Sequence, residues 1–318
     1  MKSKLIFIFF ICLALFCSKT QESFFQYNDF IFGSYVTIKI FASDSIQAKR
    51  SIRKIIQTLR HIDTVASVYI KESEIYQLNK KGSAKMSPEL KELIIKAIEV
   101  SEKSAGAFDI TVRPAMISWG FDSLDTKQSP IAEKNFDSSL VSLINYKKIR
   151  IVDDSIYLQP GMELDLGGLA VGYAVDKACE VAKNSGVKSG LIDAGGDIVC
   201  FGNRTYKIGI RNPFGKGAIR AVKIKNQSIS TSGSYEKFIQ KGNKKYTHII
   251  NPKTGQPIAD TIDNLVSVTV IADKTVDADA YATAVFVLGA ERGAELISSL
   301  GMQGILITKT GKMIEIGF

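Results

Sequence analysis

Asp279 and Thr283 stand four residues apart near the start of a predicted helix, in the stretch Asp277-Ala-Asp-Ala-Tyr-Ala-Thr-Ala. Side chains at this spacing lie on one face of a helix, and the small alanines leave room there for a ligand. A carboxylate and a hydroxyl are hard oxygen donors of the kind that Mg²⁺ takes, with water or phosphate at its other positions. The alternative is that the aspartate caps the helix and the threonine hydroxyl donates to a backbone carbonyl. From the spacing alone, this alternative is favoured over a metal site.

A stretch rich in glycine, Asp165-Leu-Gly-Gly-Leu-Ala-Val-Gly-Tyr-Ala-Val-Asp176, joins a predicted strand to a predicted helix. Glycines let the backbone approach a ligand closely, and the free N–H groups at a helix start favour an anion such as a phosphate. The string matches neither the Walker A loop nor G-x-G-x-x-G. A turn that needs glycine for packing is therefore an equally good interpretation.

His248 is the better placed of the two histidines in the chain. It lies on a predicted strand that runs into the turn Asn251-Pro-Lys-Thr-Gly-Gln-Pro257. There it could act as a base or as a hydrogen-bond donor to a phosphate. A histidine with a purely structural role in the strand is an equally good interpretation. His61 ends an amphipathic pattern, where we expect a surface histidine.

The composition is that of an ordinary globular protein: 318 residues, 45% hydrophobic and 23% charged. The formal net charge is +9, but the lysines are scattered along the chain. This pattern predicts a basic surface that tolerates anionic ligands or lipid head groups. A nucleic-acid partner is not expected, because it would need a denser basic run with stacking aromatic residues.

The N-terminus has the pattern of an export signal: a charged start, an apolar run from Leu5 to Phe16, and then Cys17. The pattern resembles a bacterial lipoprotein signal, with residues 1–17 as signal peptide, Cys17 as the lipidated residue and 18–29 as a tether. We expect an exported protein anchored by lipid at the periplasmic side of the bacterial inner membrane. Phe16 departs from the small residue usual before the cysteine, so an uncleaved N-terminal anchor is the alternative.

The apolar patterns predict one folded domain over residues 30–318, of the α+β class, with mixed, largely antiparallel sheets and packed helices. Strands come in runs and helices in clumps. Cys179 and Cys200 are expected as buried free thiols, with a disulfide between them as the alternative. The predicted strands are 30–41, 155–159, 162–166, 189–194, 197–202, 206–211, 221–225, 227–231, 246–250, 265–271, 304–307 and 313–316. Ser45 is predicted to cap a helix, and a short helix or turn is predicted from Ser73 to Asn79. Further predicted helices begin near Ser87, Leu169, Asp277 and Gly293.

Taken together and in order, the motifs resemble the flavin transferases of the thiamine-biosynthesis lipoprotein family (the ApbE family), enzymes that move FMN from FAD onto a threonine of a target protein. The resemblance covers nearly all of the chain after residue 30 and implies a T-fold, ApbE-like architecture. The strings that carry it are Phe32-Gly-Ser, Tyr69 with Ser73-Glu-Ile and Leu78-Asn, Gly106-Ala-Phe-Asp-Ile-Thr, Trp119-Gly-Phe, Asp165-Leu-Gly-Gly-Leu-Ala, Gly172-Tyr-Ala-Val-Asp, Asp193-Ala-Gly-Gly-Asp, Thr231-Ser-Gly, His248-Ile-Ile-Asn-Pro-Lys-Thr-Gly and Asp279-Ala-Tyr-Ala-Thr.

The resemblance implies a Mg²⁺ ion held by Asp279, Thr283 and the backbone carbonyl of Ala170, with FAD as substrate and a threonine of another protein as acceptor. His248 becomes a candidate for proton transfer or phosphate orientation. The implied flavin contacts are Phe32, Tyr69, Ala107, Phe108, Asp109, Gly167, Tyr173 and Ile249. Hydrolysis of FAD to FMN and AMP is one alternative activity, and a flavin-binding lipoprotein without chemistry is another.

Three residues depart from the pattern of the family. Val171 stands where many members have a lysine, Asn251 replaces the usual aspartate before the proline, and Phe32 replaces a common methionine. None of the three is an expected metal ligand. The loss of the lysine implies that the metal supplies more of the positive charge against the phosphates.

Overall fold

The computed structural model describes residues 22–122, 136–235, 238–241, 244–259 and 264–318. Its centre is an eight-stranded sheet in the order β1-β2-β6-β7-β10-β14-β15-β16, in which all neighbouring strands are antiparallel. The strands of this sheet are β1 (Ser23–Ile31), β2 (Ser34–Ala42), β6 (Ser189–Ala194), β7 (Asp197–Phe201), β10 (Gln227–Gly233), β14 (Leu265–Ala272), β15 (Gln303–Thr308) and β16 (Met313–Ile316).

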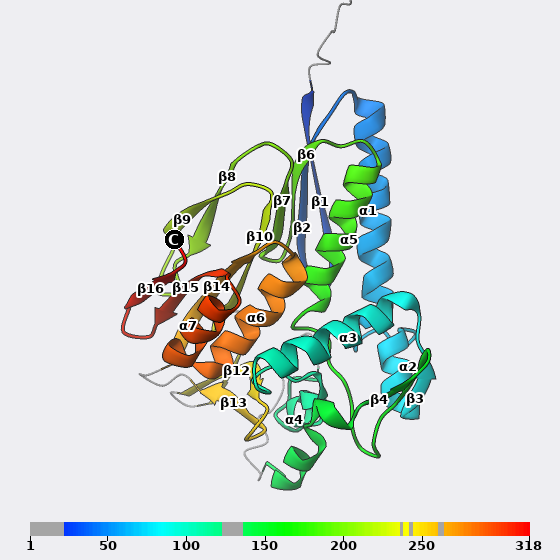
Figure 1. Cartoon of the computed structure of the whole chain (residues 1–318), viewed down its shortest axis with the longest axis vertical. Helices are drawn as coiled ribbons and strands as arrows, with labels where there is room; N and C mark the ends of the chain where they lie inside the picture. Colours follow the sequence, from blue (N-terminus) through cyan, green and yellow to red (C-terminus); the bar gives the residue numbers. More distant parts are fainter. Residues whose placement is uncertain (1–21, 123–135, 236–237, 242–243, 260–263) are drawn as a thin grey trace, which may run out of the picture.

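Helices cover one face of this sheet (Figure 1). The long helix α1 (Ser45–Ala66) lies beside α5 (Ala170–Asn184), and α6 (Thr275–Leu288) and α7 (Ala290–Ser299) continue the layer. Helix α6 is buried on nearly every side, and most of its residues are apolar. The helices α2 (Glu74–Lys81), α3 (Pro88–Lys103) and α4 (Arg113–Ser118) lie below α1 and α5 in Figure 1. The α+β class is therefore confirmed.

The other face of the sheet packs against a separate hairpin of β8 (Tyr206–Arg211) and β9 (Ala218–Ile224). Ile210 and Val222 of this hairpin share a buried apolar cluster with Ile229 and Ile305 of the main sheet. The predicted strand over residues 206–211 is therefore present as β8, but it does not continue the main sheet. Two layers, helices on one side and a hairpin on the other, enclose the central strands.

Two small sheets complete the fold, one of β3 (Ser83–Lys85), β4 (Arg150–Val152) and β5 (Ser155–Tyr157), the other of β11 (Phe238–Lys241), β12 (Lys244–Asn251) and β13 (Gln256–Ala259). Trp119, which belongs to one of the strings that carry the resemblance, contacts the second of these sheets. Its indole N–H donates to the carbonyl of Gly255 at 3.0 Å, and its ring stacks on Tyr246 at 5.8 Å.

Helix starts follow the capping pattern of the sequence closely. Ser73 caps α2 and Ser87 caps α3, each accepting a backbone N–H with its hydroxyl, as predicted. For α1 the prediction is one residue late, because Asp44 rather than Ser45 accepts the N–H groups of Ile46 and Gln47.

The expected strand over residues 30–41 is wrong in its extent, because two strands meet there in a hairpin. Phe32 and Gly33 form its turn with positive φ angles of 57° and 68°, which suits a two-residue hairpin turn. Strand β1 already begins at Ser23, so most of the segment 18–29, expected as a tether, belongs to the sheet.

The expected strand over residues 162–166 is also wrong. The side chain of Asn79 donates to the carbonyl of Leu164 and accepts its N–H, both at 2.8 Å, so this backbone bonds to a side chain instead of a neighbouring strand. The thiols of Cys179 and Cys200 are free and buried, as expected.

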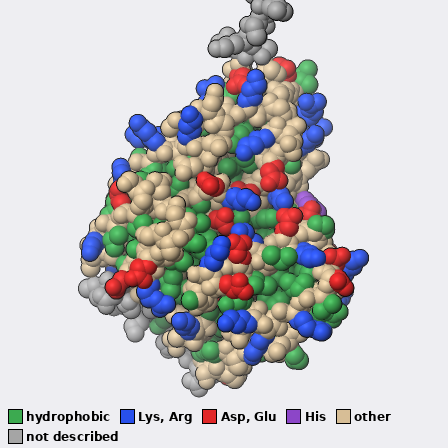
Figure 2. Space-filling view, in the orientation of Figure 1, with side chains coloured by type: hydrophobic (Ala, Val, Ile, Leu, Met, Phe, Trp, Pro, Cys, Tyr) green, Lys and Arg blue, Asp and Glu red, His purple; other side chains and the backbone are tan. Residues whose placement is uncertain are grey.

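The surface bears charges of both signs. Figure 2 shows Lys and Arg interspersed with Asp and Glu over the face that it presents, in keeping with the scattered lysines of the sequence. Within the described part of the chain, no helix is both long and apolar enough to span a bilayer. The segment with the expected export signal, including Cys17, lies outside the described residues.

Candidate functional site

Asp279 and Thr283 lie one turn apart on α6, close to the start of α5 and to β10. A carboxylate oxygen of Asp279 accepts the backbone N–H of Gly172 at 3.2 Å, and the Thr283 hydroxyl lies 3.4 Å from that of Ser232 on β10. Asp279 is 7% exposed. Because α6 begins at Thr275, Asp279 is inside the helix, and the capping interpretation does not apply to it.

The cap of α6 comes from another helix. The carboxylate of Asp176, on α5, accepts the backbone N–H groups of Thr275 and Val276 at 2.8 and 3.0 Å. Burial raises the pKa of Asp176, and these two hydrogen bonds oppose that effect. Asp176 thus fixes the start of α6 against α5, and so positions the turn that carries Asp279.

The glycine loop lies against Asp279 and Thr283. A Cβ atom on Gly172 would lie 2.6 Å from the carbonyl oxygen of Thr275 and 2.9 Å from the Cβ of Asp279. A Cβ on Gly168 would lie 3.1 Å from the ring of Phe108 and 3.5 Å from the Thr283 hydroxyl oxygen. Packing therefore requires glycine at position 172.

Ala170, the expected carbonyl ligand, lies between these two glycines in the chain. The preceding Gly168 lies near Thr283 and the following Gly172 lies near Asp279, so Ala170 is in the turn next to both expected side-chain ligands. A carboxylate, a hydroxyl and a carbonyl are the oxygen donors that suit Mg²⁺. Within the described residues, no group of three or more His, Cys, Asp or Glu side chains could hold a metal. An ion here would therefore need further oxygen atoms from water or from a bound phosphate.

A buried cation that sequence reasoning missed contacts the start of the glycine loop. Arg113, whose side chain is 10% exposed, pairs with Asp165 at 3.4 Å and with Glu163 at 3.2 Å. The other oxygen of Asp165 accepts the N–H of Gly167 at 2.8 Å. Arg113 lies some fifty residues from the loop in sequence, so no local pattern reveals this contact.

Tyr69, an expected flavin contact, lies in the same region. Burial raises the pKa of the Tyr69 hydroxyl to about 12. The nearby charges of Asp165 and Asp122 also raise this pKa, and the charge of Arg113 lowers it. Gly167 and Tyr69, both expected to contact FAD, are thus brought together beside the ion pair of Asp165 and Arg113.

The segment 107–109 is buried and internally bonded. Ala107 and Phe108 are each 4% exposed, and Phe108 forms the wall against Gly168. The carboxylate of Asp109 accepts hydrogen bonds from the N–H and hydroxyl of Thr111 and from the N–H of Tyr146. Burial raises the pKa of Asp109 and these bonds oppose it. Asp109 therefore holds the loop together.

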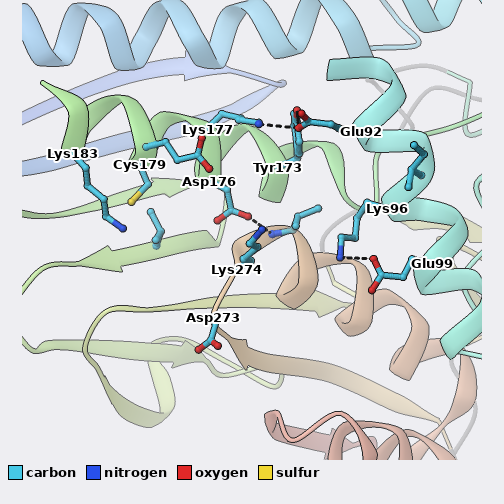
Figure 3. Close-up of a pocket in the computed structure, with 14 residues that line it drawn as sticks. Glu92, Lys96, Glu99, Tyr173, Asp176, Lys177, Cys179, Lys183, Asp273 and Lys274 are labelled. Atoms are coloured by element: carbon cyan, nitrogen blue, oxygen red, sulfur yellow. Dashed lines mark hydrogen bonds and ion pairs between the residues drawn. The ribbon is translucent and has the colours of Figure 1, made fainter. Parts of the chain in front are cut away.

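Tyr173 lines a groove that none of the other expected flavin contacts line. Its hydroxyl donates to Glu92 on α3 at 2.6 Å, and its side chain lines a groove of about 440 Å³ between α3, α5 and the start of α6 (Figure 3). Lysines and acids in this groove pair with each other, as in Lys177 with Glu92 and Lys96 with Glu99. None of the other expected site residues lines it.

His248 lies on β12, which packs against α6. Its neighbour Ile249 is 6% exposed and belongs to the main apolar core, whereas His248 is half-buried. The register of β12 against β13 shifts between Tyr246 and Ile250, so His248 lies in an irregular part of the strand.

Phe32 lies at the tip of the β1–β2 hairpin. Its N–H donates to the carboxylate of Asp63, whose pKa is raised by burial and lowered by this bond. Beside the hairpin lies the turn Gly195-Gly196, in which Gly195 donates its N–H to the carbonyl of Tyr35 at 3.0 Å. Phe32 thus stands at the end of the sheet where β7 begins and β10 ends.

Two aspartates flank that glycine turn. Asp193 accepts the N–H of Gly196 at 3.0 Å, and the half-buried Asp197 accepts a short hydrogen bond from the hydroxyl of Ser230 on β10. Burial raises the pKa of Asp197 to about 7. Ser232, two residues along β10, contacts Thr283, so polar groups connect the hairpin end with α6.

Comparison with known proteins gives consistent matches over nearly the whole chain. The model of the ApbE family matches residues 32–306. An Escherichia coli protein named FAD:protein FMN transferase is 32% identical over 286 residues, which cover 84% of this chain and 80% of that protein. The ApbE protein of Thermotoga maritima superposes with a TM-score of 0.84 at 26% identity, over 92% of this chain and 97% of its own. The flavinyl transferase ApbE of Pseudomonas stutzeri gives 0.81 at 26% identity, over 93% and 95%.

Proposed function

The chain belongs to the ApbE family, and from this membership we propose that it transfers FMN from FAD to a target protein and releases AMP. The observation that carries the proposal is the convergence of the glycine loop with Asp279 and Thr283. Gly172 donates its N–H to Asp279, and Gly168 packs beside the Thr283 hydroxyl. Two motifs about a hundred residues apart are thus in contact, which supports the proposal that they form one site.

In the proposed reaction a threonine hydroxyl of the acceptor attacks the phosphorus on the FMN side of FAD. A new oxygen–phosphorus bond forms, and the bond from that phosphorus to the bridging oxygen of the pyrophosphate breaks. AMP leaves with the bridging oxygen, and the hydroxyl proton passes to a base or to water. The nucleophile belongs to the partner, so the chain itself needs no Ser-His-Asp arrangement.

Asp279, Thr283 and the carbonyl of Ala170 are the residues that would hold Mg²⁺. When bound, the ion supplies positive charge against the pyrophosphate of FAD. The chain's own part is to hold these donors in place: Gly172 bonds to Asp279, and Ser232 lies beside Thr283. Asp176 keeps the first turn of α6 against α5.

Positive charge near the loop comes from Arg113 rather than from position 171. Its guanidinium is held by Asp165 and Glu163, and Asp165 also binds the N–H of Gly167. We propose that this arrangement shapes the floor on which the phosphates of FAD lie. His248, on the strand that packs against α6, is our candidate for proton transfer or phosphate orientation.

We also propose that the protein is exported and anchored by a lipid on Cys17, on the outer side of the inner membrane. The support is the sequence pattern before residue 18. Electrophoretic mobility before and after a block of lipoprotein processing tests this, with Cys17→Ala as the control. An unchanged mobility in both would remove the lipid from the proposal.

The activity is tested by incubation of the chain from residue 18 with FAD, Mg²⁺ and an acceptor that carries an Asp-Gly-Ala-Thr sequence. We expect covalent flavin fluorescence on the acceptor and an equal amount of AMP. FMN and AMP without a labelled acceptor would identify an FAD hydrolase instead. FAD binding without either product would identify a flavin-binding protein, and EDTA should abolish turnover by a metal-dependent transferase.

A further inference from the structure

Strand β1 is an unusually open edge of the main sheet. It is nine residues long, against four for β16 at the other edge, and within the described chain it pairs only with β2. Edge strands usually carry lysine, proline or a bulge, because an open edge is a template for another strand. The sequence of β1 has neither lysine nor proline, and its register with β2 is continuous from Ser23 to Ile31.

The register shows which backbone groups of β1 face outward. Ile31 pairs with Ser34 across the two-residue turn, and Tyr35 directs its carbonyl the other way, to Gly195. Since hydrogen-bonded and non-bonded pairs alternate in an antiparallel ladder, the odd-numbered residues of β1 bond to β2. The N–H and carbonyl groups of Gln26 and Asn28 therefore point to the open edge.

Aromatic side chains stand beside this edge on the face of the sheet away from the helices. Phe30 is 60% exposed and Tyr35 is 79% exposed, and their rings form an edge-to-face pair with centroids 5.6 Å apart. The β8–β9 hairpin covers the more central strands on this face. Exposed aromatic pairs next to free backbone groups mark surfaces that bind other polypeptides.

The edge leads to the proposed active site. Strand β1 ends at the turn of Phe32 and Gly33, and the Ser34 hydroxyl oxygen lies 2.6 Å from where a Cβ on Gly195 would be. The following Asp197 bonds to Ser230 on β10, the strand that also contacts Thr283. A polypeptide laid along β1 would therefore reach the end of the sheet where Ser232 contacts Thr283, one of the expected metal ligands on α6.

We propose that β1 binds the flavin acceptor: an extended segment of the acceptor protein adds to the sheet as a ninth strand, and Phe30 and Tyr35 hold one of its apolar side chains. This inference rests on the proposed function, because a transferase that acts on proteins must hold its acceptor beside the site. Backbone pairing suits an acceptor that must be extended for its threonine to be reached.

The test compares Gln26→Pro with Gln26→Ala in transfer assays with a folded acceptor domain that wild type labels. Proline removes the outward N–H and places its ring at the edge, while the bonds of β1 to β2 remain. Alanine removes the same side chain but keeps the N–H. We expect Gln26→Pro to raise the KM for the acceptor about fivefold or more, with unchanged FAD affinity, and Gln26→Ala to leave it unchanged.

A second variant, Phe30→Ser with Tyr35→Ser, tests the aromatic pair without a change in the backbone and serves if Gln26→Pro fails to fold. It should also raise the acceptor KM with unchanged FAD affinity. A wild-type acceptor KM in this variant and in folded Gln26→Pro would overturn the inference. If the acceptor KM is unchanged but the substitutions disrupt a dimer of the protein, the edge binds a second copy of the chain. If the acceptor KM is unchanged but they disrupt binding to vesicles, the edge binds a membrane. Wild-type transfer remains the separate test of the proposed function.

Discussion

The carboxylate of Asp279 accepts the backbone N–H of Gly172 at 3.2 Å, which joins the middle of α6 to the first turn of α5. The N–H groups at a helix start carry partial positive charge, which complements the carboxyl oxygens of Asp279. The contact also orients the carboxylate while leaving lone pairs for a cation. The hydrogen bond thus holds Asp279, a proposed metal ligand, against the glycine loop. The phosphates of FAD would lie beside the same loop.

Replacement of Asp279 by asparagine separates charge from packing. The amide oxygen can still accept the N–H of Gly172, so the fold should persist, but the negative charge is lost. We expect flavin transfer to fall about 100-fold or more, together with weaker Mg²⁺ binding in calorimetry. Asp277→Asn is the matched control, because Asp277 lies on the same helix and pairs with Lys96 at 3.2 Å. Equal loss in both variants would argue against a metal ligand at position 279.

Replacement of Gly172 by alanine tests the close approach of α5 and α6. The new methyl would lie 2.6 Å from the carbonyl oxygen of Thr275, so the helices must move apart. We expect a loss of about 1–3 kcal/mol in the free energy of unfolding, measured with urea. Gly215→Ala is the control, since its nearest neighbour would be 3.6 Å away. Equal stability in the two variants would mean that the helices are not in contact at this point.

Replacement of Tyr173 by phenylalanine tests whether this residue touches the flavin. Its hydroxyl is bonded to Glu92, so we expect a loss of about 1 kcal/mol in stability. The Kd for FAD, measured by fluorescence, should stay within about twofold. Tyr69→Ala, at the site beside Asp165, should raise that Kd about tenfold. A Tyr173→Phe protein that binds FAD as poorly as Tyr69→Ala would restore Tyr173 as a flavin contact.

Local signals in the sequence predicted most elements. Ser73 and Ser87 cap the predicted helices because their hydroxyls act within one turn. The expected strand at 162–166 failed because its partner, the side chain of Asn79, is more than eighty residues away. An alternating pattern reports which side is apolar, but it does not report whether another strand is available to pair.

For the site residues as well, the sequence showed the local relationships but not the contacts between distant segments. The spacing of Asp279 and Thr283 on one helix was visible in the sequence, and the structure brings both to the glycine loop. The cap from Asp176 and the ion pairs of Arg113 were not visible, because each joins elements that are distant in the chain. Strand β1 was mistaken for a tether because, as an exposed edge, it carries little apolar alternation.

Asp197 should make stability depend on pH in the direction opposite to most carboxyl groups. Burial raises its pKa from 3.8 to about 7, so the folded protein holds a proton that the unfolded chain releases. The stabilisation of the folded protein by this bound proton is fully present below pH 4 and is lost as the pH rises to about 7. We expect Asp197→Asn to lack it, so its stability relative to wild type should increase by up to about 4 kcal/mol between pH 4 and pH 8.

Urea unfolding of both proteins across this range measures the difference, because every other carboxyl group is shared. Asp44→Asn gives a comparison of opposite sign: hydrogen bonds from Gln47 and Ser43 lower the pKa of Asp44 at the cap of α1. Its stabilisation is present above pH 4 and is lost as the pH falls. A difference between Asp197→Asn and wild type that is independent of pH would show that Asp197 is ionised in the folded protein throughout, and that its bond to Ser230 joins a hydroxyl to a carboxylate.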